Sequence, residues 1–117
     1  MRERPSASRA DVFTAMYRDA IALVADLVGH AHLTSLAGGN LAIEAVIEGG
    51  WLWVTDEDDA LFGDRDSETG WSVGVYPGTR DSNLEHRHRV FLSAHGTDLS
   101  VLRRLLSTAL REFAGQR

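Results

Sequence analysis

Two closely spaced histidine pairs carry the side chains of this sequence that are best suited to chemistry. They are His30/His32 and His86/His88, and His95 follows the second pair closely. Residues two apart on a β-strand point the same way, so His86 and His88 are able to chelate one metal ion, with a third ligand from an acidic loop. No HExxH spacing or cysteine accompanies them. The alternative is therefore that both pairs are ordinary solvated residues of a strand entry and a linker.

Seven acidic side chains between residues 56 and 68 form the second candidate for a metal site. The alternate acidic residues from Asp64 to Glu68 resemble the start of a calcium-binding loop, which uses oxygen ligands at alternate positions. The sixth position of such a loop would be Thr69 instead of glycine, and the twelfth would be Val75 instead of glutamate. We therefore expect a solvated loop of mutually repelling charges.

Covalent catalysis finds little support in the residue types. The chain has no cysteine and no lysine, which excludes disulfides, thiol catalysis, Schiff-base chemistry and a phosphate-loop lysine. Ser93 and His95 can share one strand face, but no acidic residue is marked to orient the imidazole. We expect a non-catalytic protein without a cofactor. A metal-binding protein or small enzyme that uses His86, His88 and the acidic loop is the alternative.

The charge balance argues against broad binding of nucleic acid. Twelve basic residues, all arginine, face seventeen acidic ones, and the formal net charge is −5. Nucleic-acid binding needs a positive surface, so the arginines are expected to lie on solvated faces. An acidic regulator that mimics or associates with nucleic acid is a second alternative. Arginine without lysine, together with frequent alanine and glycine, is typical of GC-rich bacterial genomes.

Length and periodicity indicate the elements that must position these residues. The 117 residues, 44% hydrophobic and 25% charged, suit one soluble globular domain over 8–117, preceded by a flexible arm over 1–7. Apolar residues at three- and four-residue steps predict one helix from Arg9 to Val28, ended by Gly29. Residues 30–40 are expected to form a linker.

Alternating patterns predict four strands and a second helix after the linker. Two strands lie within 41–56, joined by a turn at Gly49-Gly50, and the others cover 71–76 and 87–94. A final helix begins at Thr97 or Asp98 and ends near Gly115. The order α-β-β-β-β-α predicts an α+β two-layer sandwich, an antiparallel sheet with both helices on one face.

The outer face of that sheet is the strongest functional feature. A two-residue turn at Gly49-Gly50 pairs Glu48 with Trp51 and Val46 with Trp53, and it leaves an apolar core face on the other side. A sheet that buries one face does not need aromatic residues on the other. The expected contact surface consists of five apolar residues with three charged residues at its rim: Val46, Trp51, Trp53, Tyr76 and Phe91, with Glu44, Glu48 and Arg89.

Two simpler explanations of the aromatic residues stay open. Cross-strand aromatic pairs can merely stiffen a hairpin, and the N-terminal arm can cover the face. We favour a small protein–protein interaction module (adaptor, immunity-like or chaperone-like) that is homodimeric and binds a further protein partner. The longest apolar stretch is far too short to cross a membrane, and the charged start is unlike a secretory leader. A cytoplasmic protein is therefore expected.

Overall fold

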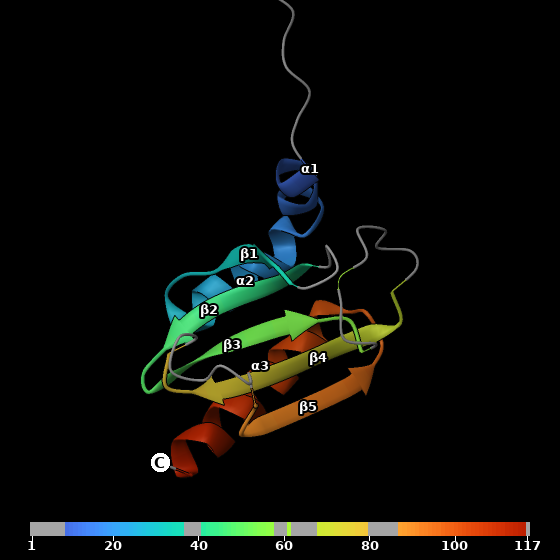
Figure 1. Cartoon of the computed structure of the whole chain (residues 1–117). Helices are drawn as coiled ribbons and strands as arrows, with labels where there is room; N and C mark the ends of the chain where they lie inside the picture. The colour runs from blue at the N-terminus through green and yellow to red at the C-terminus, as the bar shows by residue number, and fades with distance from the viewer. Residues whose placement is uncertain (1–8, 37–40, 58–60, 62–67, 80–86, 117) are drawn as a thin grey trace, which may run out of the picture.

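An antiparallel five-stranded sheet with helices before and after it forms the protein (Figure 1). A computed structural model describes residues 9–36, 41–57, 61, 68–79 and 87–116. The strands follow one another in space in the order β1-β2-β3-β4-β5. This arrangement confirms the α+β class and the expected succession of helix, strands and helix. The elements are α1 (Arg9–Met16), α2 (Arg18–Val28), β1 (His32–Ser35), β2 (Leu41–Ile47), β3 (Gly50–Thr55), β4 (Gly70–Pro77), β5 (Val90–His95) and α3 (Leu99–Gly115).

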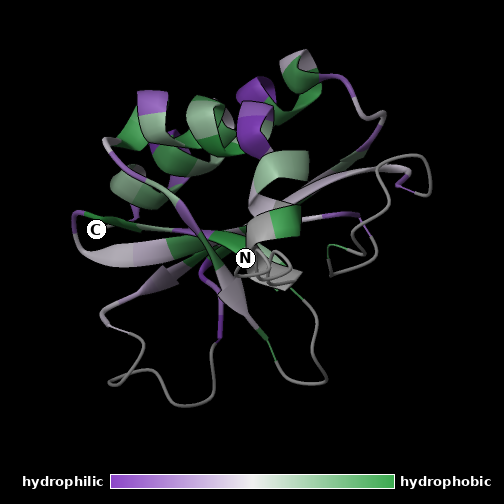
Figure 2. Ribbon diagram, turned by 90° about the horizontal axis from the view of Figure 1, so that it is seen from above, coloured by the Kyte–Doolittle hydropathy of each residue, from purple (hydrophilic) through white to green (hydrophobic). Residues whose placement is uncertain are grey.

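The core lies between the sheet and the two longer helices, α2 and α3. Figure 2 shows the helices on one side of the sheet. Leu23 and Val24 of α2, and Leu106 of α3, are buried against alternate residues of the strands, such as Val73. The three- and four-residue helical spacing and the two-residue strand spacing therefore converge on one layer. Each fully buried aliphatic side chain contributes roughly 1.5–3 kcal/mol to this core.

The helix predicted as one element is interrupted at Tyr17. This residue has φ −104° and ψ 17°, outside the helical region, and separates α1 from α2. The Tyr17 side chain is fully buried in the core. Of these two helices, α2 carries the buried stripe among the residues whose side chains are described, and α1 extends past the β1 edge of the sheet (Figure 1). The apolar spacing continues through Tyr17, so the sequence pattern did not reveal the break.

The segment predicted as a linker contains an additional strand, β1. Its four residues pair antiparallel with β2, and His32 lies opposite Glu44. The stretch HLTS has a single large apolar residue and is too short to show a two-residue alternation. The pairing partner in β2 thus defines this strand, which makes the sheet five-stranded instead of four-stranded.

The turn between β2 and β3 consists of Glu48 and Gly49, and not of Gly49 and Gly50 as expected. Ile47 pairs with Gly50, and Gly49 has a positive φ of 82°. Gly50 belongs to β3, where an added Cβ would overlap the carbonyl oxygen of Tyr76. The expected register was therefore wrong by two residues. A shift of two leaves every side chain on its original face, so the assignment of faces is correct.

The strand β4 follows the expected faces closely. Trp71, Val73 and Val75 of β4 are buried in the core, as predicted. The indole N–H of Trp71 donates to the carbonyl oxygen of Thr97 at 3.1 Å, which fixes the start of α3 against β4. Within the described part of the chain, no helix is long and apolar enough to cross a membrane.

Candidate protein-binding surface

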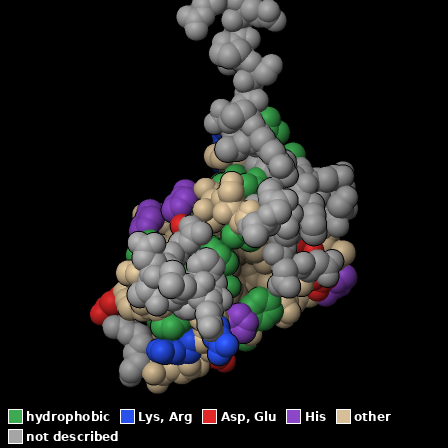
Figure 3. All heavy atoms as spheres, in the orientation of Figure 1, with side chains coloured by type: hydrophobic (Ala, Val, Ile, Leu, Met, Phe, Trp, Pro, Cys, Tyr) green, Lys and Arg blue, Asp and Glu red, His purple; other side chains and the backbone are tan. Residues whose placement is uncertain are grey.

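One row of directly opposed residues crosses the sheet on the face that the helices do not cover. It consists of His32, Glu44, Trp53, Gly74 and Phe91, one from each strand in order. Figure 3 views this outer face and shows hydrophobic side chains on it. The row combines a carboxylate, an indole and a glycine, and because these residues differ in size, the surface of this face is uneven.

Glu44 connects the first three members of the row. The Nε2 atom of His32 lies 3.1 Å from Glu44 Oε1, and the indole N–H of Trp53 donates to Oε2 at 2.6 Å. The Glu44 residue is only 6% exposed, whereas the His32 side chain is 53% exposed. A buried carboxylate needs such partners, and bonds to a charged acceptor are stronger than neutral ones. Glu44 therefore holds the Trp53 ring in one orientation.

Trp51, Trp53 and Tyr76 form an aromatic cluster beside this row. The rings of Trp51 and Tyr76 stack with centroids 4.8 Å apart and planes 12° apart. Trp53 meets both edge-on, with centroid distances of 6.3 Å to Trp51 and 5.1 Å to Tyr76. Each such aromatic contact stabilises the fold by about 0.5–1.5 kcal/mol in addition to the effect of burying the rings. The cluster rigidifies the outer face in addition to presenting apolar surface.

The expectation that both indoles are exposed is wrong for Trp51. Trp51 is 2% exposed and Tyr76 is 8% exposed, and their stacked rings each cover one face of the other. Trp53 is half-buried. Val46 and Phe91 are the apolar members of the expected surface that are well exposed, at 56% and 40%. The apolar area available for contact is therefore centred on Trp53, Val46 and Phe91.

Gly74 creates a hollow in the middle of the outer face. The row has no side chain at this position, so a space of about 160 Å³ opens between Trp53 on one side and Phe91 on the other. The Tyr76 side chain leans over it, and a Cβ added to Gly74 would lie 3.2 Å from both the Cε1 atom and the hydroxyl oxygen of Tyr76. The described lining residues are Leu36, Trp53, Thr55, Gly74, Tyr76 and Phe91.

A second hollow lies one step further along β3 on the same face. It has a volume of about 210 Å³, and Val46 and Trp51 form its apolar walls with Glu44 beside them. Trp51 of this hollow and Trp53 of the first are two residues apart on one strand. That spacing corresponds to about 6.5 Å along a strand. The outer face thus offers two neighbouring apolar hollows.

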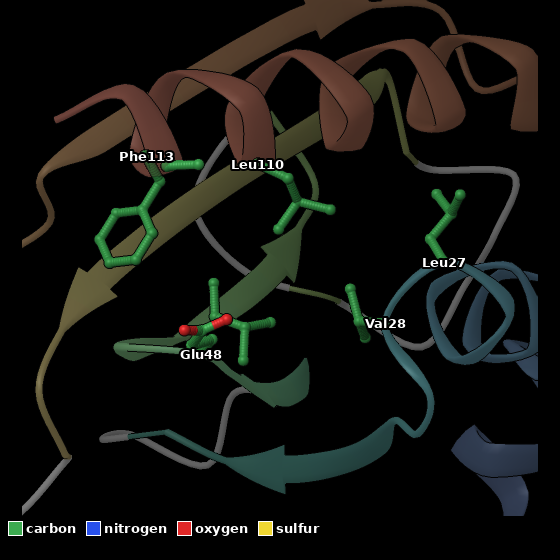
Figure 4. Close-up of a pocket in the computed structure, with 7 residues that line it drawn as sticks. Leu27, Val28, Glu48, Leu110 and Phe113 are labelled. Carbon is green, nitrogen blue, oxygen red and sulfur yellow. The ribbon is translucent and has the colours of Figure 1, made fainter. Parts of the chain in front are cut away.

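Two of the three residues expected at the rim lie elsewhere. Glu48 is in the β2–β3 turn and lines a hollow of about 280 Å³ between α2 and α3, on the helix side (Figure 4). Arg89 places its guanidinium 5.8 Å from the ring of Phe113 in α3. The backbone N–H of Arg89 donates to the carbonyl oxygen of Val75, and Val90 is the residue that pairs with Val75 in the sheet. Arg89 and Val90 therefore both lie opposite the single residue Val75 of β4. Such a bulge interrupts the alternation on which the prediction for Arg89 relied.

The candidate metal ligands are not brought together in the described part of the chain. His86 lies outside the described residues, as do all four acidic residues between 58 and 67. The ring of His88 contacts the aromatic residues, 5.0 Å from Phe91 and 6.1 Å from Tyr76. Among the described residues, no group of three or more histidine, aspartate and glutamate side chains is placed to hold an ion.

The acidic residues next to the loop have structural partners. Asp56 is buried, and its Oδ1 atom accepts hydrogen bonds from the backbone N–H groups of Thr69 and Gly70, at 2.9 and 3.1 Å. Glu57 Oε1 lies 2.9 Å from His95 Nδ1, and hydrogen bonds with the side chains of Thr69 and His95 lower the pKa of Glu57. These contacts close the connection between β3 and β4.

Residues 70–74, GWSVG, have the GxSxG spacing of the nucleophile turn of α/β-hydrolases, which the sequence reasoning above did not single out. Ser72 lies in the middle of β4, fully buried between Thr55 and Ser93 of the neighbouring strands. A nucleophile turn needs a sharp corner between a strand and a helix that exposes the serine. The pattern therefore reflects a strand that uses small residues on its outer face.

No protein-family model, curated protein or solved structure matches this chain. The outer face must therefore be judged on its own geometry. Gly74 and His32 are the members of the central row that sequence reasoning missed. Small residues at alternate positions of β4, from Gly70 to Gly74, are the one signal that could have indicated the hollow.

Proposed function

We propose that the protein is a non-catalytic binding module, adaptor-like or chaperone-like, that recognises an extended segment of a partner protein on the outer face of its sheet. The observation that carries this proposal is the pair of hollows on either side of the aromatic cluster. Rigid aromatic walls next to exposed Val46 and Phe91 match the composition of interface centres.

The spacing of the hollows supports an extended ligand. In an extended chain, residues i and i+2 point the same way and lie about 6.5–7 Å apart. Trp51 and Trp53 have this separation along β3, and each belongs to one hollow. Two alternate apolar side chains of a partner segment can therefore enter both hollows at once.

The size and chemistry of the hollows favour one apolar side chain each. Their volumes of about 160 and 210 Å³ compare with the roughly 150 Å³ of an engineered apolar cavity that binds benzene. Burying one aliphatic or aromatic side chain contributes roughly 1.5–3 kcal/mol. Two such anchors give a modest affinity, which suits an adaptor or a chaperone.

Selection from a displayed library of random linear peptides tests the proposal. We expect the selected peptides to share apolar residues at positions i and i+2, and their binding to change Trp53 fluorescence. Val46→Ser and Phe91→Ser should each weaken binding about tenfold, because each removes exposed apolar wall. Val12→Ser is the matched control, since Val12 on α1 is 45% exposed and lies away from the sheet face.

The proposal fails if the selected peptides lack the alternate apolar pattern, or if the sheet-face variants bind them as well as Val12→Ser does. We further propose a homodimeric state and a location in the bacterial cytoplasm, and the binding of a partner segment requires neither of them. Size measurement in solution and fractionation of native cells test them. The contacts of the described residues offer no specific support for the metal-binding or nucleic-acid alternatives.

A further inference from the structure

The strand β5 offers a second, independent surface, its backbone edge. Among the described strands, β5 pairs on one side only, with β4. The N–H of Gly96 donates to the carbonyl oxygen of Thr69 at 2.8 Å, and hydrogen-bonded pairs recur at every second residue of an antiparallel ladder. The backbone groups of Phe91, Ser93 and His95 therefore point away from β4.

Apart from the bulge where Arg89 meets its first residue, this edge lacks the features that usually prevent pairing. The six residues VFLSAH contain no proline, lysine, arginine or carboxylate. The other edge strand, β1, has only four residues, and α1 packs beside it. Natural sheets protect their edges by short strands, charges or covering elements. By these criteria β1 is protected and β5 is open.

Apolar side chains line the β5 edge on the helix side as well. Leu92, Val101 and Leu105 are partly buried and pack against the core. Leu110 and Phe113 lie on the flank of α3 that faces α2 across the hollow of Figure 4. Helical geometry then places Val101 and Leu105 on the opposite flank, above β5. The open edge thus continues into an apolar strip on α3.

We propose that β5 pairs antiparallel with β5 of a second copy of this chain across a two-fold axis at Leu92. The result is one continuous ten-stranded sheet, twice the five strands of one chain, with the helices of both copies on the same side. Two residues that pair across the axis must have their side chains on the same face of the sheet. The numbers of the two paired residues therefore add to an even value, as in the pair of Leu92 with Leu92 and the pair of Val90 with Ala94.

The strand complements itself in this register. On the helix side, Leu92 meets its own counterpart and Val90 meets Ala94, so apolar side chains meet apolar ones. On the outer face, Phe91 lies opposite Ser93 of the second copy. No charged side chain lies within the strand to oppose the pairing. A second copy is therefore the partner that fits this edge.

The pairing goes beyond the proposed recognition of a partner segment, because it uses backbone groups and not the hollows. It also joins the outer faces of the two copies. The Phe91 wall of each hollow then stands beside Ser93 of the other copy. Two binding sites would lie on one continuous surface.

Sedimentation equilibrium of the full chain tests this proposal through Ser93→Pro. Ser93 is exposed, and its N–H points away from β4, so proline removes only the donor that the second copy needs. We expect the wild-type chain and the control Ser93→Ala to be dimers, and Ser93→Pro to be a monomer with an unchanged circular dichroism spectrum. Exchange of the Phe91 and His95 amides with solvent should be slow in the wild-type dimer and fast in the Ser93→Pro monomer, where position 93 has no amide hydrogen.

Ser93→Lys is the second variant, for the case that proline at this position prevents folding. It introduces a charge on each side of the axis and should also give a folded monomer. A wild-type chain that stays monomeric over about a hundredfold range of concentration overturns the proposal. So does a dimer that persists in a folded Ser93→Pro or Ser93→Lys chain. Peptide binding by monomeric Ser93→Lys would show that the two proposals stand or fall separately.

Discussion

Individual residues on the outer face act mainly by holding their neighbours. Glu44 accepts the indole N–H of Trp53 at 2.6 Å and lies 3.1 Å from His32 Nε2, so one buried carboxylate joins three strands. Replacing either partner leaves the carboxylate under-satisfied in a poorly hydrated place. The position of the Trp53 ring, and with it the shape of the Gly74 hollow, depends on this one side chain.

Substitution of Glu44 tests this dependence. Glu44→Gln keeps the shape but replaces one acceptor oxygen by a donor, so we expect the free energy of unfolding in urea to fall by about 1–2 kcal/mol. Trp53 fluorescence should shift at the same time. His32→Ala is the control and should cost under about 1 kcal/mol, because the His32 side chain is 53% exposed. Equal losses in the two variants would contradict the role of Glu44 as the holder of Trp53.

Glu68 is a second residue with a measurable signature. It is 7% exposed, and both of its carboxylate oxygens lack a hydrogen-bond partner among the described residues. Burial raises the pKa of Glu68 from 4.5 to about 7. The folded chain therefore binds more protons than the unfolded chain between these values, so the free energy of unfolding falls as the pH rises through this window and levels off above it.

The substitution Glu68→Gln should remove this pH dependence. We expect it to flatten the stability curve between pH 4.5 and 7 and to raise the free energy of unfolding at pH 8 by on the order of 2 kcal/mol. Urea titrations at several pH values measure both effects. Glu112→Gln, on the exposed side of α3, is the control. A curve of unchanged slope for Glu68→Gln would show that Glu68 is ionised without cost.

At the scale of elements, close approach of β3 to β4 determines where the hairpin turns. Gly50 pairs with Ile47 and Pro77, and its Cα faces the carbonyl oxygen of Tyr76. A glycine is needed there for space, whereas Gly49 supplies the positive φ of the turn. The two adjacent glycines thus serve two different purposes.

Gly50→Ala should therefore be strongly destabilising. The added methyl group must push β3 away from β4, and we expect a loss of about 2 kcal/mol or more in urea unfolding. Gly115→Ala is the matched control, because a Cβ at Gly115, at the end of α3, meets nothing within 4 Å. That variant should be neutral or slightly stabilising. Similar losses at both positions would contradict the proposed function of Gly50 as a spacer.

At the scale of the whole molecule, the two proposed surfaces, the outer face and the β5 edge, are both parts of the sheet that the helices leave uncovered. The helices occupy one side of the sheet, which leaves the outer face and the β5 edge for partners (Figures 1 and 2). A dimer through β5 would place two sets of hollows on one surface. A partner with two apolar segments then binds more tightly than either segment alone, since the second contact is intramolecular.

Local patterns in the sequence determined the class of the fold and the face on which most side chains lie. Alternation within β4 and the stripes of α2 and α3 depend on neighbours a few residues away, so they could be interpreted without knowing the partners of each strand. The aromatic residues were assigned to the outer face for the same reason. The bulge at Arg89 shows the limit of such reasoning, because one extra residue reverses the alternation.

Only the tertiary structure decided which of these residues meet. The row from His32 to Phe91 requires four pairings between strands, and one of those strands has no pattern of its own. The burial of Trp51 and the hollow at Gly74 follow from that register, because a ring is covered or exposed according to the side chains opposite it. Periodicity acts along the chain, whereas the shape of a surface arises from contacts between distant segments.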